Sequence, residues 1–370
     1  MVAYCFFCQC LLYILNKVFF SVKNVALVFS IEALAMAVFE IPTGSFSDIF
    51  GRKKVIMLYS ILVLVALSFL SVGENIFMFV GYAIFNGLAM ALSSGNDQAL
   101  IYDSLKEEGK EQYYKKVIGT MYALWPLGAS IGSIIGGYLA HISLKTPIVY
   151  SFIPISIAFV LSFFLKEPNC HKTEENNLFK HIGSSVKVII KSKQLLILMV
   201  GGLILMSLGE SMHLLKPLFF EFKEIPLIYF GYFNALIFGL ASLGFYISHS
   251  VSEKFGNKKT LIFSLLLALL FTIVATFTHK YVAAFFLAFS SIFFGIRNTV
   301  IDYLFNKNIP SSYRATINSI NSFVSKIGIA IMVPFIGYFA DLYNINVALM
   351  VVVGIMFVVP ILFLFIKDEK

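Results

Sequence analysis

Long apolar runs, separated by mostly short polar segments, follow one another along the whole chain. A helix that crosses a membrane needs about 20 mostly apolar residues. By that criterion the sequence predicts twelve membrane-spanning helices, at residues 1–20, 24–47, 54–73, 75–101, 115–140, 147–165, 194–218, 227–250, 260–278, 281–304, 315–340 and 346–366. Because most connecting segments are short, neighbouring helices are expected to be antiparallel. The pattern therefore predicts an all-α membrane protein.

One connecting segment is much longer than the others. Residues 167–193 are polar and charged and show no apolar periodicity, so we interpret them as a cytoplasmic linker. The linker divides the chain into two predicted domains, residues 1–166 and residues 194–370, each a bundle of six helices.

The basic residues indicate how these helices are oriented. With the N-terminus in the cytoplasm, 20 of the 28 Lys and Arg residues fall on the inner side, 6 on the outer side and two within spans. Lys and Arg are enriched in cytoplasmic loops, so both termini are predicted to be cytoplasmic, in the plasma or inner membrane of a bacterium. The net charge of +8 then needs no nucleic-acid partner to explain it.

Composition narrows the class of protein further. Hydrophobic residues make up 59% of the chain and charged residues 13%, whereas soluble domains are about 25% charged. A soluble enzyme, a disordered protein and a nucleic-acid-binding domain are therefore excluded. Cys5, Cys8 and Cys10 lie in the first apolar run, where we expect packing roles rather than metal binding. The first run has no basic segment before it, so no signal peptide is expected.

The two predicted domains resemble each other weakly. Residues 47–54 (SDIFGRKK) follow the second span, and residues 252–259 (SEKFGNKK) follow the eighth. Likewise residues 137–140 (GYLA) close the fifth span and residues 337–340 (GYFA) close the eleventh. Two parallel six-helix repeats are a transporter architecture.

Charged residues within the predicted spans are unevenly distributed. The apolar cores of the third, sixth, ninth and twelfth spans contain none, and the second, fourth, seventh, tenth and eleventh spans hold Glu32, Glu40, Asp97, Glu210, His213, Arg297 and Lys326. A charge that faces lipid costs several kcal/mol. We therefore expect the four charge-free helices to face lipid and the other eight to surround a central cavity.

The loop after the second span carries a recognisable motif. Residues 44–54 read GSFSDIFGRKK and resemble the signature G-x-x-x-D-x-x-G-R-[KR]-[KR] of the major facilitator superfamily. The resemblance implies two six-helix bundles, and a conformational latch made by Gly44, Asp48, Gly51, Arg52 and Lys53. The alternative is a basic loop that only sets topology, but such a loop needs neither Asp48 nor the two glycines.

Three further runs bear on the subfamily. Residues 39–44 (FEIPTG) and 94–105 (SGNDQALIYDSL) resemble runs in a bacterial subset of drug and metabolite exporters. The fifth span resembles the antiporter signature G-x-x-x-G-P-x-x-G-G through Gly128, Gly132, Gly136 and Gly137, although Ser133 stands at the proline position. Small residues at this spacing also serve ordinary helix packing. Ala83 replaces the arginine that many proton-coupled exporters carry in the fourth span.

Proton coupling requires a carboxylate that titrates inside the membrane. Glu32 is the first candidate, with a local hydrogen-bonding role as its alternative, and Glu40 is expected to be structural. Asp97 is a second candidate, with helix capping as its alternative. Glu210 is the third.

The remaining charged residues suggest a substrate cavity. Glu210, His213 and Lys216 are three residues apart and share one stripe of the seventh helix, just before Pro217, where the helix is expected to weaken. Their alternative is a self-satisfied Glu–His pair. Lys326 needs a carboxylate partner, for which Glu32 and Glu210 are the candidates.

Two further residues are assigned to the walls of that cavity. Arg297 is placed at a lower cavity wall together with Asp302, and Trp125 among the aromatic residues that could bind flat ligands.

These observations predict a secondary transporter that works by alternating access. The leading interpretation is proton-coupled export of a small organic molecule by a monomer, without cofactors. Nutrient uptake is the alternative, and a receptor-like relative that does not transport is less favoured because it would not need the latch. No nucleotide loop or nucleophile motif of an enzyme is present in the sequence.

Overall fold

The structure is a computed structural model that describes residues 21–73, 75–94, 96–110, 113–168, 178–310 and 313–367. It is helical and divides into two compact units, residues 24–174 and residues 175–370 together with 21–23. The predicted span 1–20, with Cys5, Cys8 and Cys10, lies outside the described residues. Within the described part, nine helices are long and apolar enough to cross a membrane.

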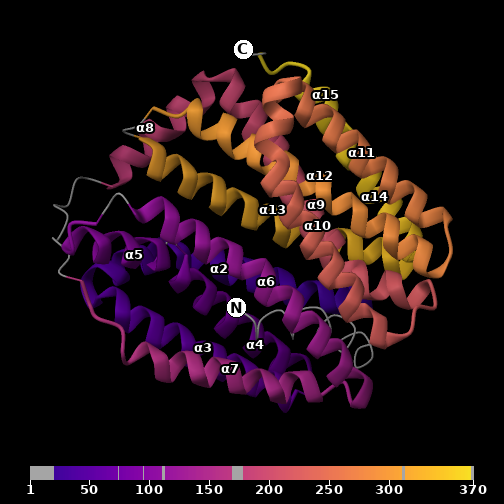
Figure 1. The fold of residues 1–370 in the computed structure, drawn as a ribbon, viewed down its shortest axis with the longest axis horizontal. Helices are drawn as coiled ribbons and strands as arrows, with labels where there is room; N and C mark the ends of the chain where they lie inside the picture. Colours follow the sequence, from indigo (N-terminus) through magenta and orange to yellow (C-terminus); the bar gives the residue numbers. More distant parts are fainter. Residues whose placement is uncertain are drawn as a thin grey trace. The chain divides into compact units, whose positions relative to one another are not determined.

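The first unit is built on helices α2 to α7 (Figure 1). Their bounds are Val22–Phe50 for α2, Arg52–Ser71 for α3, Ile76–Ser93 for α4, Asn96–Glu107 for α5, Tyr114–Ile142 for α6 and Thr146–Ser162 for α7. Helix α3 packs against α4, α5 and α7, and α6 packs against α5 and α7. The ends of α3, α5 and α7 thereby come together.

The second unit contains helices α8 to α15 (Figure 1). Their bounds are Leu178–Lys191 for α8, Lys193–Phe222 for α9, Leu227–Phe255 for α10, Asn257–Phe277 for α11, Lys280–Lys307 for α12, Arg314–Leu342 for α13, Ile345–Met356 for α14 and Val358–Phe363 for α15. The most extensive packing joins α12 to α10 and α11, and α13 to α9.

Three local predictions are corrected by the structure. The span predicted at 75–101 is two helices, because Ser94 adopts an extended backbone conformation that ends α4, and α5 begins at Asn96. Asp97 therefore lies in the first turn of α5 rather than inside a span. The linker predicted at 167–193 contains the helix α8. Helix α9 continues through Pro217 to Phe222, so the proline does not break it.

The internal repeat is visible in backbone conformation. Gly51 precedes α3 with φ 97° and ψ 146°, and Gly256 precedes α11 with φ 83° and ψ 151°. This region is accessible to glycine and strained for other residues. The two residues stand at matching places in the repeated sequence, so each repeat needs a glycine to turn the chain between its second and third predicted spans.

Helices α10 and α12 cross at very close range. A Cβ atom at Gly244 would lie 2.1 Å from the Ile292 carbonyl oxygen, and one at Gly295 would lie 2.3 Å from the Ala241 carbonyl oxygen. Close to the crossing, the Ser248 hydroxyl donates to the Ile296 carbonyl at 2.9 Å. The missing side chains therefore allow the two backbones to touch.

Replacing Gly244 with alanine is expected to destabilise the protein by about 1–3 kcal/mol, because the new methyl group forces two backbones apart. Thermal unfolding in detergent measures the effect. Gly239→Ala in the same helix is the matched control, since a Cβ there has nothing within 4 Å; it should leave the unfolding temperature unchanged or raise it slightly. Equal losses in both variants would show that the crossing is not tight.

Candidate functional site

The carboxylate of Glu167 caps the start of α3. Its Oε1 accepts a hydrogen bond from the Arg52 backbone N–H at 2.6 Å, and its Oε2 accepts one from the Lys53 N–H at 2.9 Å. The first N–H groups of a helix have no partner within it and form the positive end of its dipole. Glu167 satisfies two of these groups with a negative charge. A side chain at Gly51 would collide with this carboxylate, since its Cβ would lie 2.9 Å from the carboxyl carbon.

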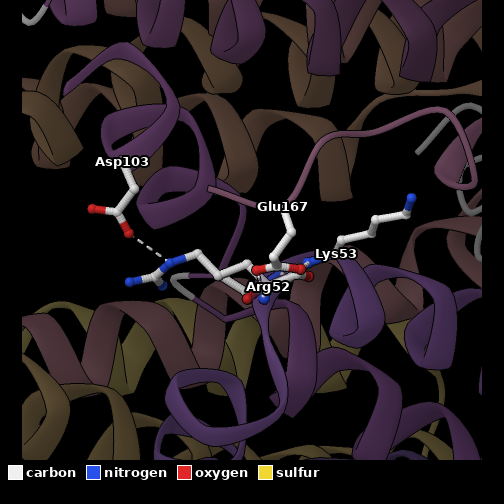
Figure 2. A network of polar contacts seen from close by, with 5 residues as sticks. Arg52, Lys53, Asp103 and Glu167 are labelled. Atoms are coloured by element: carbon white, nitrogen blue, oxygen red, sulfur yellow. Dashed lines mark hydrogen bonds and ion pairs between the residues drawn. The ribbon is translucent and has the colours of Figure 1, made fainter. Parts of the chain in front are cut away.

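The side chain of Arg52 turns towards α5. Its Nε lies 2.7 Å from Asp103 Oδ2 in a partly buried ion pair. Figure 2 shows Asp103 and Glu167 approaching the start of α3 from different segments. The buried side chain of Asn96 adds a third contact, because its Nδ2 donates to the Arg52 carbonyl oxygen at 3.2 Å. Arg52 is therefore held through its N–H, its carbonyl and its guanidinium.

Lys53 points away from Asp103 (Figure 2). Its Nζ donates to the carbonyl oxygen of Phe163, just past the end of α7, at 2.8 Å. A cation is stabilised at the negative end of a helix dipole. We name Arg52, Lys53, Asp103 and Glu167 the α3 cluster; its two cations and two anions join the ends of α3, α5 and α7 within the first unit.

Next to the α3 cluster lies an exposed ion pair. Lys166 Nζ lies 3.2 Å from Glu107 Oε1, and the lysine side chain is 83% exposed. Exposed pairs of this kind contribute little stability. Lys166 is therefore a useful comparison for its neighbour Glu167.

The predicted latch overlaps the α3 cluster only in part. Gly51, Arg52 and Lys53 lie in it, whereas Gly44 and Asp48 are in α2 and their side chains lie outside what the structure describes. The latch role of all five residues stays a prediction. Glu167 was missed. Its position in the sequence could have indicated its role. Glu167 lies just after the sixth predicted span, on the predicted cytoplasmic side, where an acidic side chain can reach the basic loop.

A second polar group joins α2 and α4. Asn86 Nδ2 donates to Glu32 Oε1 at 2.7 Å and lies 3.3 Å from the Tyr82 hydroxyl. Eight residues further along both helices, the Ser94 hydroxyl donates to Glu40 Oε1 at 3.1 Å. The constant separation of 54 residues shows that α2 and α4 run parallel. Both carboxylates are therefore held by polar side chains of the α4 segment.

The other first-unit candidates lie on α5 and α6. Trp125 is in α6 and largely exposed, and Asp97 is half-buried at the start of α5. The glycines of the predicted fifth span, which are Gly128, Gly132, Gly136 and Gly137, are all buried in α6. Ser133, at the proline position of the signature, donates to the Ala129 carbonyl at 2.7 Å, so its polar group is satisfied within the helix.

In the second unit, α9 carries the predicted stripe. Glu210 and His213 are half-buried and Lys216 is buried. The His213 ring contacts the Phe238 ring of α10 in an edge-on arrangement, with 6.1 Å between ring centres. His213 and Lys216 therefore contact protein, whereas Glu210 and His213 remain partly accessible.

Arg297 is a buried cation in α12. It is 4% exposed, and its Nε has no hydrogen-bond partner among the described residues. Its guanidinium lies over the Phe294 ring, 5.8 Å from the ring centre. The predicted pairing with Asp302 is not seen among the described residues, because five residues correspond to about 140° of helix rotation and place the two side chains on different faces.

Lys326 in α13 donates to the Ser322 hydroxyl at 3.0 Å. Two residues further on, Gly328 faces α9, where a Cβ would lie 2.3 Å from Ser207 Oγ. Two residues turn a helix by about 200°, so Lys326 is directed away from α9. This geometry disfavours Glu210 of α9 as its partner.

The long apolar helices of the described part define a multi-pass membrane protein, and the family that it matches is one of transporters. Residues 6–252 and 235–370 match the Major Facilitator Superfamily, and the chain belongs to that family. Its fold is the all-α fold of two six-helix bundles, and the protein is not an enzyme.

Two bacterial relatives align over most of the chain. An uncharacterised MFS-type transporter, YxaM of Bacillus subtilis (strain 168), is 24% identical over 95% of this chain and 89% of its own length. The cis,cis-muconate transport protein of Acinetobacter baylyi (strain ATCC 33305 / BD413 / ADP1) is 23% identical over 92% of this chain and 84% of its own length.

Solved structures show the same fold. The crystal structure of a mutant of the nucleoside transporter NupG superposes with a TM-score of 0.82 at 15% identity, covering 99% of this chain and 97% of that one. A bacterial homolog of the human lysosomal transporter Spinster, in an inward-facing and unoccupied conformation, gives 0.76 at 13% identity, covering 100% and 95%. At these identities the likeness concerns the fold alone.

Proposed function

We propose that the protein is a proton-coupled secondary transporter that moves a small organic molecule across the membrane by alternating access. The α3 cluster carries this proposal. It joins three helix ends of the first unit through short charged contacts. We propose that these contacts form and break together, because alternating access needs a two-state element.

Glu32 is the proposed proton carrier. It is a carboxylate in a predicted span, and its Oε1 accepts a bond from Asn86. Carboxylates inside a membrane are costly and usually functional. Asp97, Glu210, His213, Arg297, Lys326 and Trp125 remain proposed contributors to coupling or to substrate contact.

Export is the first proposed direction. It rests on the resemblance of the α6 glycines to the antiporter signature. Uptake is the second candidate, because Ser133 replaces the proline of that signature and because one relative is a cis,cis-muconate transport protein. We further propose a monomer in the cytoplasmic membrane of a bacterium. The distribution of Lys and Arg supports placing both termini in the cytoplasm.

Proteoliposomes with an imposed pH gradient and an internal pH dye test this function. Cis,cis-muconate, a nucleoside, and a panel of antibiotics and dyes would be offered in turn. Proton movement opposite to the substrate is expected for export, and movement in the same direction would establish uptake. Substrate flux that does not depend on the proton gradient would contradict proton coupling. If no compound of the panel is transported or bound, transport of these classes of substrate is contradicted.

A further inference from the structure

Helix α8 ends next to a membrane span. Lys191 is its last residue, and α9, one of the helices able to cross a membrane, begins at Lys193. Only Ser192 separates them; it has φ −97° and ψ 99°, and its side chain caps α9 by accepting from the Leu195 N–H at 3.3 Å. Because Ser192 is not helical, α8 does not continue the path of α9. Its C-terminal end therefore lies at the membrane surface.

The described part of α8 has three distinct faces, at about 100° of rotation per residue. Ser185 and Ile189 are buried and form the face that packs on α9 and α13. Val186 and Ile190 follow about 100° and 140° further round and are 37% and 67% exposed. Lys187 and Lys191 come after them and are also exposed.

The exposed apolar face and the basic face lie side by side. A helix that rests in a membrane surface has this arrangement, because its apolar side chains enter the acyl region while its lysines reach the phosphates. Nearby, Lys193 Nζ lies 5.6 Å from the centre of the Phe365 ring, whose side chain is exposed. Lysines and aromatic rings at the end of a span are typical anchors at a membrane interface.

We propose that α8 is an interfacial helix that binds the headgroups of anionic phospholipids, with Val186 and Ile190 inserted in the bilayer and Lys187 and Lys191 on the phosphates. Charge complementarity selects this partner, since a basic face needs an anionic surface and the adjoining span already brings the bilayer to this helix. The inference concerns lipid recognition, and it stands apart from the transported substrate and its coupling.

Fluorescence quenching tests how deep the apolar face lies. The chain has a single tryptophan, so Trp125→Phe provides a silent background for Ile190→Trp. Lys187→Trp is the matched control on the neighbouring basic face. In nanodiscs of brominated phosphatidylcholine and phosphatidylglycerol, the full-length protein should show at least twofold stronger quenching at position 190 than at 187. Equal quenching at both positions would overturn the proposal.

Lipid selectivity tests the basic face. With Ile190→Trp as reporter, the ratio of quenching by brominated phosphatidylglycerol to that by brominated phosphatidylcholine should exceed one. It should fall towards one in Lys187→Gln/Lys191→Gln, with about fivefold weaker preference for each lysine lost, and persist in Lys187→Arg/Lys191→Arg. Lys254→Gln/Lys259→Gln removes the same charge from exposed positions at the α10–α11 connection and should leave the ratio unchanged.

Three results would contradict this assignment. The quenching ratio could stay above one in the α8 double variant, or it could fall equally in the α10–α11 control. Either result would mean that the lysines of α8 do not select lipids by headgroup charge. A tryptophan at 190 that is shielded from water but quenched by neither lipid would mean that protein covers this face, whether a second copy or another chain.

Discussion

Glu167→Gln is expected to slow transport at least tenfold. The glutamine keeps one acceptor oxygen but presents an NH₂ group to the second backbone N–H, and it loses the charge that stabilises the start of α3. Hydrogen bonds to a charged group contribute about 1.5–3 kcal/mol. A loss of about 2 kcal/mol of stability from one conformational state lowers its population about thirtyfold relative to the other states. The transport rate should fall because the cycle has to pass through that state. Initial rates in proteoliposomes, for whichever substrate the panel identifies, measure the effect.

The neighbouring residue provides the control for this prediction. Lys166→Gln removes a charge one position earlier, from an exposed ion pair with Glu107, and should leave transport unchanged. Hydrogen exchange gives a readout that needs no substrate, because the Arg52 and Lys53 amides should lose protection in Glu167→Gln and keep it in Lys166→Gln. Normal transport with unprotected amides would show that the cap is structural only.

Glu32→Gln is expected to reduce accumulation driven by the proton gradient at least a hundredfold. Substrate exchange at equal pH on both sides should continue. The amide still accepts the bond from Asn86, so the α2–α4 contact survives, but position 32 can no longer bind or release a proton. Uphill transport and counterflow in the same proteoliposomes separate the two effects.

Glu40→Gln is the matched variant for Glu32. Its carboxylate is held by Ser94 in the same way, eight residues further along α2. It should keep proton-driven accumulation. If Glu32→Gln still accumulates substrate, then Glu32 is a structural ligand of Asn86. If both variants fail, the carboxylates act together or the helix pair itself is disturbed.

Much of the molecule could be predicted from the sequence, because the signals are local. Eight of the nine helices of the described part that can cross a membrane begin and end within a few residues of the predicted spans, and α4 is the exception. A run of about 20 apolar residues has few other stable solutions. The family could be predicted from residues 44–54, because a motif of eleven adjacent residues keeps its spacing in any fold. Gly51 belongs to that motif, and its φ of 97° gives the physical reason for a glycine there.

Two misses were local as well. Helix α8 was not predicted although Val186, Ile189 and Ile190 share one apolar stripe at helical spacing, because this stripe is short and lies in a segment that is otherwise polar and charged. The end of α4 at Ser94 was not predicted, because the chain stays largely apolar beyond it. The helix stops there because the backbone of this one residue is extended, and composition does not indicate that.

The tertiary structure alone decided which distant groups meet. Glu167 reaches Arg52 across 115 residues, and Asp103 reaches it across 51. Gly244 and Gly295 look like ordinary small residues in the sequence, and only the crossing of α10 and α12 shows that neither tolerates a side chain. Apolar length and motif spacing are properties of a continuous stretch of chain and can be read from it. A hydrogen bond or a backbone contact depends on how whole helices pack, which no single stretch of sequence contains.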